Sequence, residues 1–122
     1  MKIFRTGYFY IGYQYKRKKH GCFKIGITGR TPKARENEIN QNEVFKIYTS
    51  ICFNNISKPA LEKIEADVRF KLSLISKYNS IQNDHFLYNI EDSKTDICEI
   101  SQKAIEYAVQ SYSEIMKITE EV

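Results

Sequence analysis

The sequence predicts an α+β domain in which a small, mostly antiparallel β-sheet is flanked by helices in the order β-β-α-β-α-β-α. Two short runs of aromatic and β-branched residues lie on either side of a polar turn, which is typical of a β-hairpin. Two later segments carry apolar residues every three or four positions, the period of an amphipathic helix. The 122 residues contain no repeat or Gly/Ser-rich linker, so we expect one domain spanning residues 1–122.

The predicted hairpin pairs residues 8–13 with residues 22–28. Its turn carries four consecutive cations, which we call the basic tip: Lys16, Arg17, Lys18 and Lys19. A first helix follows at once, with Thr31 as the N-cap, Pro32 at the first helical position, and an end near residue 41.

Residues 44–53 read as the third strand, which we expect to end at Asn54-Asn55. Ser57 then caps a second helix that has Pro59 in its first turn and ends at residues 78–80. The apolar stripe of this helix comprises Leu61, Ile64, Val68, Leu72 and Ile75. Residues 85–90 predict a short fourth strand, and a long final helix covers about residues 94–119.

Charge is distributed unevenly along the chain. Residues 1–48 hold eleven Lys/Arg and three Asp/Glu, whereas residues 49–122 hold eight and twelve. A basic N-terminal half predicts a polyanion-binding face, and we assign the basic tip, Arg30 and Lys33 to nucleic-acid binding. No apolar run approaches the roughly 18 residues of a membrane span, so we expect a soluble, cytoplasmic protein without a membrane partner.

Two tripeptides of the hairpin carry a resemblance to a known family. Tyr8-Phe9-Tyr10 and Lys24-Ile25-Gly26 resemble the paired motifs of the GIY-YIG nuclease superfamily, with Tyr8 in place of a glycine and Lys24 in place of a tyrosine. The form Phe-Lys-Ile-Gly-x-Thr is similar to a phage- and virus-associated branch. The resemblance covers residues 7–90 as the core, with the final helix outside it.

The resemblance implies a metal-dependent endonuclease that hydrolyses phosphodiester bonds, in DNA rather than RNA. Tyr10 would be the base, with its pKa of about 10 lowered by the neighbouring cation Lys24. Arg35, the helix arginine, would grip the scissile phosphate with its planar fork of donors. Glu65, on the second helix, would hold one Mg²⁺ or Mn²⁺ with waters completing the shell.

Two other functions stay open at this point. The first is a nucleic-acid-binding module on the same fold that does not cut, with Lys24 marking the altered site. The second is an interaction protein whose final helix binds a second copy of the chain or another protein. Arg35 and Glu65 favour the nuclease, because the loss of either residue would have favoured the binding module and both are present.

Overall fold

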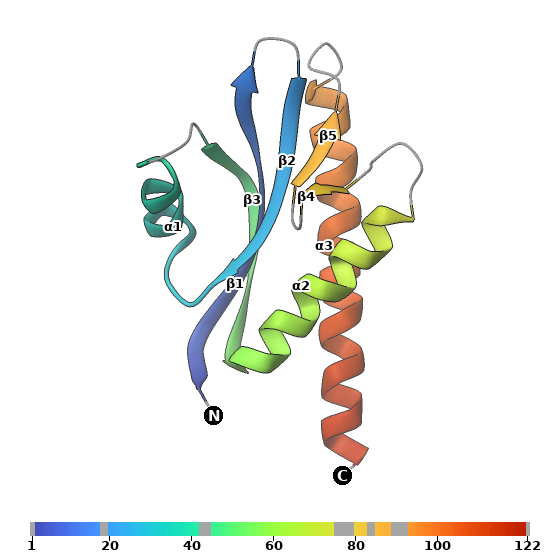
Figure 1. Cartoon of the computed structure of the whole chain (residues 1–122). Coiled ribbons are helices and arrows are strands. Elements are labelled where there is room, and N and C mark those ends of the chain that lie inside the picture. The colour runs from blue at the N-terminus through green and yellow to red at the C-terminus, as the bar shows by residue number, and fades with distance from the viewer. Residues whose placement is uncertain are drawn as a thin grey trace.

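The protein, seen here as a computed structural model, is described over residues 2–17, 20–41, 45–74, 80–82, 85–88 and 93–121. It confirms the predicted α+β class and adds one short strand to the predicted order (Figure 1). The elements are β1 (Ile3–Arg17), β2 (His20–Thr28), α1 (Pro32–Ile39), β3 (Phe45–Ser57), α2 (Lys58–Ser73), β4 (Ser80–Gln82), β5 (His85–Tyr88) and α3 (Ser93–Glu121).

The five strands form one sheet in the order β3-β1-β2-β5-β4, and neighbouring strands run antiparallel. β1 therefore has a partner on each side. At its middle, Tyr10 lies opposite Gly26 of β2 and Ser50 of β3. The predicted hairpin is confirmed, with strands that extend further toward the tip than expected.

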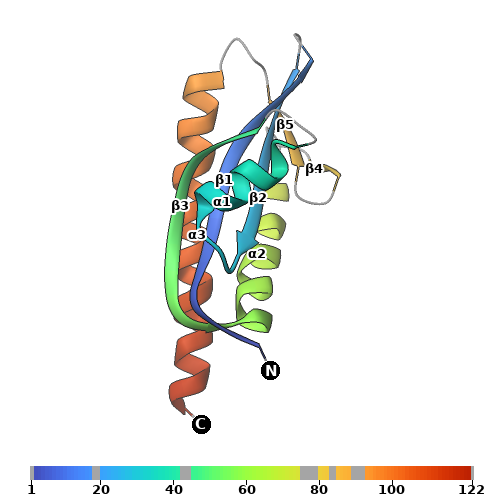
Figure 2. The same cartoon turned by 90° about the vertical axis from the view of Figure 1, so that its left-hand side faces the viewer.

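The helices cover the two faces of the sheet unequally. α1 lies on one face, whereas α2 and α3 lie together on the other (Figure 2). β1 contributes side chains to the cores on both faces of the sheet, because successive side chains of a strand point to opposite faces. Phe9 and Ile11 enter the core under α2 and α3, and Tyr10 enters a separate cluster with Ile39 of α1.

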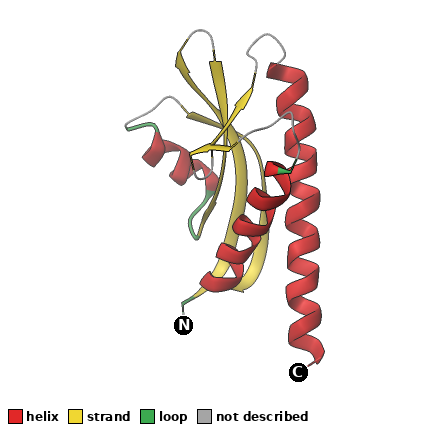
Figure 3. Cartoon of the chain, turned by 45° about the vertical axis from the view of Figure 1, so that its right-hand side comes forward, coloured by secondary structure: helices red, strands yellow, loops and turns green. Residues whose placement is uncertain are grey.

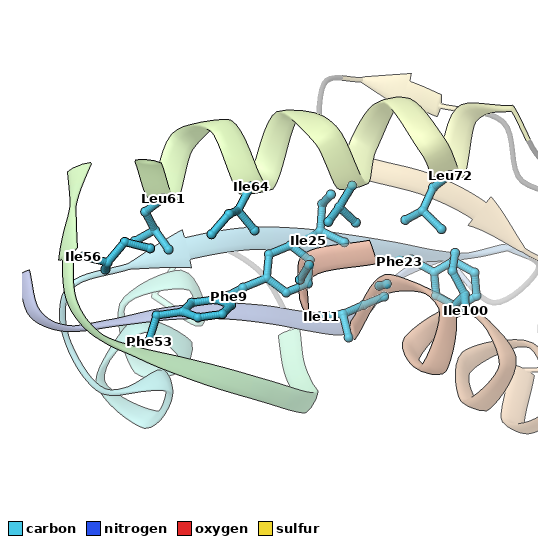
Figure 4. Packing of buried hydrophobic residues seen from close by; sticks show 13 residues of the cluster. Phe9, Ile11, Phe23, Ile25, Phe53, Ile56, Leu61, Ile64, Leu72 and Ile100 are labelled. Atoms are coloured by element: carbon cyan, nitrogen blue, oxygen red, sulfur yellow. The ribbon is translucent and has the colours of Figure 1, made fainter. Parts of the chain in front are cut away.

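The larger core lies between the sheet and α2. Leu61, Ile64 and Leu72 point from α2 toward the strands, with Leu61 beside Ile56 and Leu72 above Phe23 (Figure 4). The predicted stripe is confirmed for Leu61, Ile64, Val68 and Leu72, all fully buried. Ile75 lies outside the described residues.

α3 extends along most of the molecule and packs against the shorter α2 (Figure 3). Ser111 donates a hydrogen bond to Asp67 at 2.7 Å, and Lys71 donates to Gln110 at 3.2 Å. Val109 of α3 is partly exposed, and a partner for this helix stays a prediction. Among the residues described, no helix combines the length and the apolar character needed to cross a bilayer.

Both predicted helix starts are confirmed by their capping bonds. The Thr31 hydroxyl accepts from the Ala34 amide at 3.3 Å, and the Ser57 hydroxyl accepts from the Ala60 amide at 3.2 Å. Each bond satisfies one of the amides that the first turn of a helix leaves without a partner.

Two predicted boundaries were wrong. β3 continues through Asn54-Asn55 to Ser57, because the first residues of β1 extend the ladder and Ile3 pairs with Ser57. Asn55 adopts a left-handed φ of 51°, which asparagine tolerates better than most residues. α2 ends at Ser73, several residues before the predicted end.

A β-bulge lets β3 contribute apolar side chains to the clusters on both faces of the sheet. Ile11 pairs with Thr49 and Gly12 with Ile47, so Tyr48 is an extra residue on β3. The extra residue shifts the alternation of the strand by one. As a result, the Phe45 and Ile47 side chains join the cluster under α1, whereas Ile51 and Phe53 join the core under α2 and α3.

Polar bonds fasten α1 and its C-terminal cap to the start of β3. One oxygen of Glu36 accepts from the Ile47 amide at 2.8 Å, and Lys33 donates to the other at 3.2 Å. Asn40 accepts from the Phe45 amide at 2.6 Å. The Ile47 bond, assisted by Lys33, holds the pKa of Glu36 below its ordinary 4.5 despite partial burial.

We expect Glu36→Gln to destabilise the protein by about 1–2 kcal/mol at pH 7, since a hydrogen bond to a charged acceptor is lost. A lowered native pKa stabilises the fold above pH 4.5, and this contribution disappears as pH falls through the native pKa. Urea unfolding at pH 7 and pH 3.5 should therefore show a difference that shrinks in acid. Glu106→Gln, at an exposed position of α3, is the control. An equal difference at both pH values would contradict the role of the charge.

Candidate functional site

Tyr10 lies at the centre of the site, on the α1 face of β1. Its side chain is 1% exposed and packs with Ile39 of α1 and with Phe45 and Ile47 of β3. The Phe45 ring meets it edge-on, with centroids 6.1 Å apart and an interplanar angle of 70°. This favourable aromatic geometry fixes the direction of the phenol.

Gly26 gives the phenol its space. Gly26 lies opposite Tyr10 in the sheet, and a Cβ atom at position 26 would overlap the Tyr10 hydroxyl and the ring carbon that carries it. The phenol therefore lies across the backbone of β2. The Gly26 of the second motif is needed here for close approach rather than for an unusual backbone angle.

Arg35 reaches the same hydroxyl from α1. Its Nε donates to the Tyr10 oxygen at 3.4 Å, a long hydrogen bond. The arginine side chain is 32% exposed, so it remains partly accessible to solvent. The structure thus brings together two of the predicted catalytic residues, which are 25 positions apart in the chain.

Lys24 lies on the same face of the sheet as Tyr10. It pairs with Gly12 and stands two residues from Gly26, so it is a diagonal neighbour of Tyr10. Such neighbours have Cα atoms about 7–8 Å apart, within reach of a long side chain. Lys24 is half-buried, and its proposed effect on the phenol stays a prediction.

Glu65 comes from the other layer. It lies on α2, which packs on the face opposite α1 (Figure 2), and its carboxylate accepts from Arg69 at 2.5 Å. Helical spacing puts Glu65 on the flank of α2 away from Asp67 and Lys71, which reach α3. Since α3 packs over β1 and β3, this flank is on the β2 side. Its convergence with Tyr10 stays a prediction.

A single carboxylate with water access has the right chemistry for Mg²⁺ or Mn²⁺, since Mg²⁺ is commonly bound through one or two carboxylates. The Glu65 side chain is 21% exposed, and Arg69 would compete with the ion for it. Over the described ranges, no group of three or more His, Cys, Asp or Glu side chains is arranged as a metal site. Glu65 therefore fits the cation as one protein ligand among waters.

The predicted nucleic-acid ligands fall into two groups. Arg30 and Lys33 are exposed and lie at the start of α1; the Arg30 amide donates to the Thr28 hydroxyl at 3.0 Å. Lys16 and Arg17 are the last residues of β1. Lys18 and Lys19 lie outside the described residues, so the basic tip stays a predicted binding element.

The sequence interpretation missed Glu38. Its carboxylate pairs with Arg35 at 2.6 Å and also with Arg30. The three-residue spacing of Arg35 and Glu38 on one helix signals the first pair. No comparable spacing signals the second, because Arg30 lies in the turn before α1.

Comparison with known proteins gives one family match. The T5orf172 domain matches residues 7–113, a span that starts in β1, ends in α3 and includes all four predicted catalytic residues. No match is found among curated proteins or among solved structures. Because the family match covers most of the chain, this protein belongs to the T5orf172 domain family.

Proposed function

We propose that the protein is a metal-dependent endonuclease that hydrolyses phosphodiester bonds in nucleic acid, with DNA preferred over RNA. The observation that carries the proposal is the contact between the buried Tyr10 hydroxyl and Arg35 on the α1 face. It joins the tyrosine of the first GIY-YIG-like motif to the helix arginine. The family supports the proposal, since T5orf172 domains occur in phage-associated and nuclease-like settings.

Arg35 would bind the scissile phosphate. A guanidinium has five N–H donors in a fixed plane, and the contacts to Tyr10 and Glu38 use two of them. The remaining donors suit the oxygens of a phosphodiester, whose charge increases in the transition state. The bond to Tyr10 fixes the guanidinium plane before the substrate binds.

Tyr10 would take the proton of the attacking water. Its phenol already accepts a hydrogen bond from the Arg35 guanidinium. Lys24 would add a second positive charge on the same face. Since Tyr10 is 1% exposed, this role requires a path for the attacking water to its hydroxyl.

Glu65 would hold the divalent ion. When bound, Mg²⁺ or Mn²⁺ supplies positive charge that stabilises the developing negative charge on oxygen. The protein contribution is the position of one carboxylate, which Arg69 holds in the absence of the ion.

A nucleic-acid-binding module that does not cut is the second candidate. The burial of Tyr10 favours it, since a base must reach its water. Lys24 in place of the motif tyrosine favours it as well. In this reading Tyr10 serves only to seat α1, and Arg30, Lys33 and Arg35 bind phosphates without chemistry.

We expect Glu65→Gln to lower the cleavage rate of a supercoiled plasmid by about 10²–10⁴-fold in Mg²⁺ or Mn²⁺. Binding should change little, because glutamine keeps the shape of the side chain. Glu62→Gln, an exposed position on the same helix, removes the same charge and should cut normally. Normal cutting by folded Glu65→Gln protein would exclude Glu65 as the metal ligand.

The replacement Tyr10→Phe separates the two candidate functions. It removes one oxygen and keeps the ring that packs against Phe45. A catalytic phenol predicts a loss of about 10²–10⁴-fold in cleavage rate with unchanged nucleic-acid affinity. Tyr107→Phe, on α3, is the matched control. Full activity of the Tyr10 variant would assign the tyrosine to packing alone.

Nucleic-acid affinity should fall steeply with salt, since binding cations release counterions from the phosphates. Replacing the four basic-tip residues by alanine should lower the slope of log affinity against log salt by up to about three to four, measured by fluorescence anisotropy. A charge-matched control replaces four cations of α2 and α3: Lys58, Lys63, Lys103 and Lys117. Equal salt slopes for the two variants would show that the basic tip does not contact the nucleic acid.

A further inference from the structure

The Glu38 carboxylate lies between two arginines from different parts of the chain. Its Oε1 atom accepts from Arg35 Nη1 at 2.6 Å, and its Oε2 atom pairs with Arg30 Nη2. Arg30 belongs to the turn after β2, whereas Arg35 and Glu38 belong to α1. One oxyanion thus has a guanidinium on each of its two oxygens.

A phosphodiester group has the same recognition chemistry as this carboxylate. Each presents two oxygens that share one negative charge, and arginine binds both groups in the same way. We propose that Arg30 and Arg35 form an oxyanion site that Glu38 fills in the free protein, and that a nucleic-acid phosphate binds by displacing Glu38. The identity of the displacing phosphate rests on the proposed function, whereas the oxyanion site itself does not.

Both arginines have contacts that do not involve Glu38. Arg35 keeps its Nε bond to the Tyr10 hydroxyl, and the Arg30 amide keeps its bond to Thr28. Gly29 lies so close to the Phe4 ring that a Cβ atom there would overlap it, which fixes the turn that carries Arg30. The Arg35 guanidinium and the backbone that carries Arg30 therefore keep their positions when the carboxylate leaves.

Little ion-pair energy is lost when Glu38 leaves. The side chains of Arg30 and Glu38 are 64% and 40% exposed, and ion pairs with that much solvent contribute little to stability. Glu38 also reduces the charge of the cluster from two to one, which weakens its attraction for a phosphate. Glu38 is thus an internal competitor that lowers the affinity of the two arginines for a phosphate group.

The test compares wild type with Glu38→Gln and with Glu106→Gln, an exposed α3 position that carries the same charge change. Fluorescence anisotropy with a labelled DNA duplex should show about three- to tenfold tighter binding for Glu38→Gln. The salt slope should steepen by about one. The Glu106 variant should match wild type, and Glu38→Ala should change affinity in the same direction as Glu38→Gln.

A double variant tests whether the gain requires the site. Arg30→Gln combined with Glu38→Gln should return affinity to the wild-type value or below. The double variant has the net charge of wild type, so a gain that persists without Arg30 would show that Glu38 does not act through this site and would overturn the proposal. Weaker or unchanged binding of Glu38→Gln would overturn it too, since Glu38 would then order the arginines or play no part.

Inorganic phosphate separates this proposal from the nuclease. Phosphate should raise the melting temperature of Glu38→Gln more than that of wild type or of Glu106→Gln. If no variant binds DNA but this difference is present, the oxyanion site stands and the nucleic-acid function fails. If wild type binds and cuts DNA but Glu38→Gln binds neither probe more tightly, the competitor role fails and the nuclease stands.

Discussion

The alternation of Phe9, Tyr10 and Ile11 along β1 is the constraint on which the rest of the structure depends. β1 is hydrogen-bonded on both edges, so it cannot rotate to favour one face. Phe9 and Ile11 pack on the face that α2 and α3 cover, and Tyr10 packs on the face that α1 covers. A shift of one residue in register would place a phenol in the larger core and two apolar side chains beneath α1.

The same constraint explains the position of the candidate site. α1 is only eight residues long and contributes Ile39 as its one buried apolar side chain. Packing of so short a helix contributes little, so polar bonds from Glu36 and Arg35 hold α1 against β3 and β1. The side chains that would bind a phosphate are therefore also among those that fasten the helix. The free energy of unfolding must therefore be measured for each variant at these positions, so that a loss of binding can be told from a loss of stability.

Charge around α1 is more balanced than the sequence count suggests. Arg30, Lys33 and Arg35 all have carboxylate partners, supplied by Glu36 and Glu38. The acidic partners belong to the same helix as two of the cations, so neutralisation is local and partial. The affinity of this surface for a polyanion therefore depends on how readily these ion pairs open.

The sequence by itself determined the elements and the motifs. Period-two and period-3.6 patterns located the hairpin, the second helix and the long final helix, and hydroxyl side chains marked both helix starts. These features depend on neighbours along the chain, which is why they can be read from it. The hairpin likewise placed Tyr10 and Lys24 on neighbouring strands, whereas their register came from the structure.

Only the tertiary structure decided what depends on contacts between distant segments. The extension of β3 past Asn55 comes from its pairing with the start of β1, and the bulge at Tyr48 comes from serving two cores. Sequence spacing gave no sign that Arg30 shares the Glu38 carboxylate with Arg35, or that Glu65 approaches from the layer opposite Tyr10. The sequence gives the chemical type of each side chain, but the packing of the layers determines which charged residues pair.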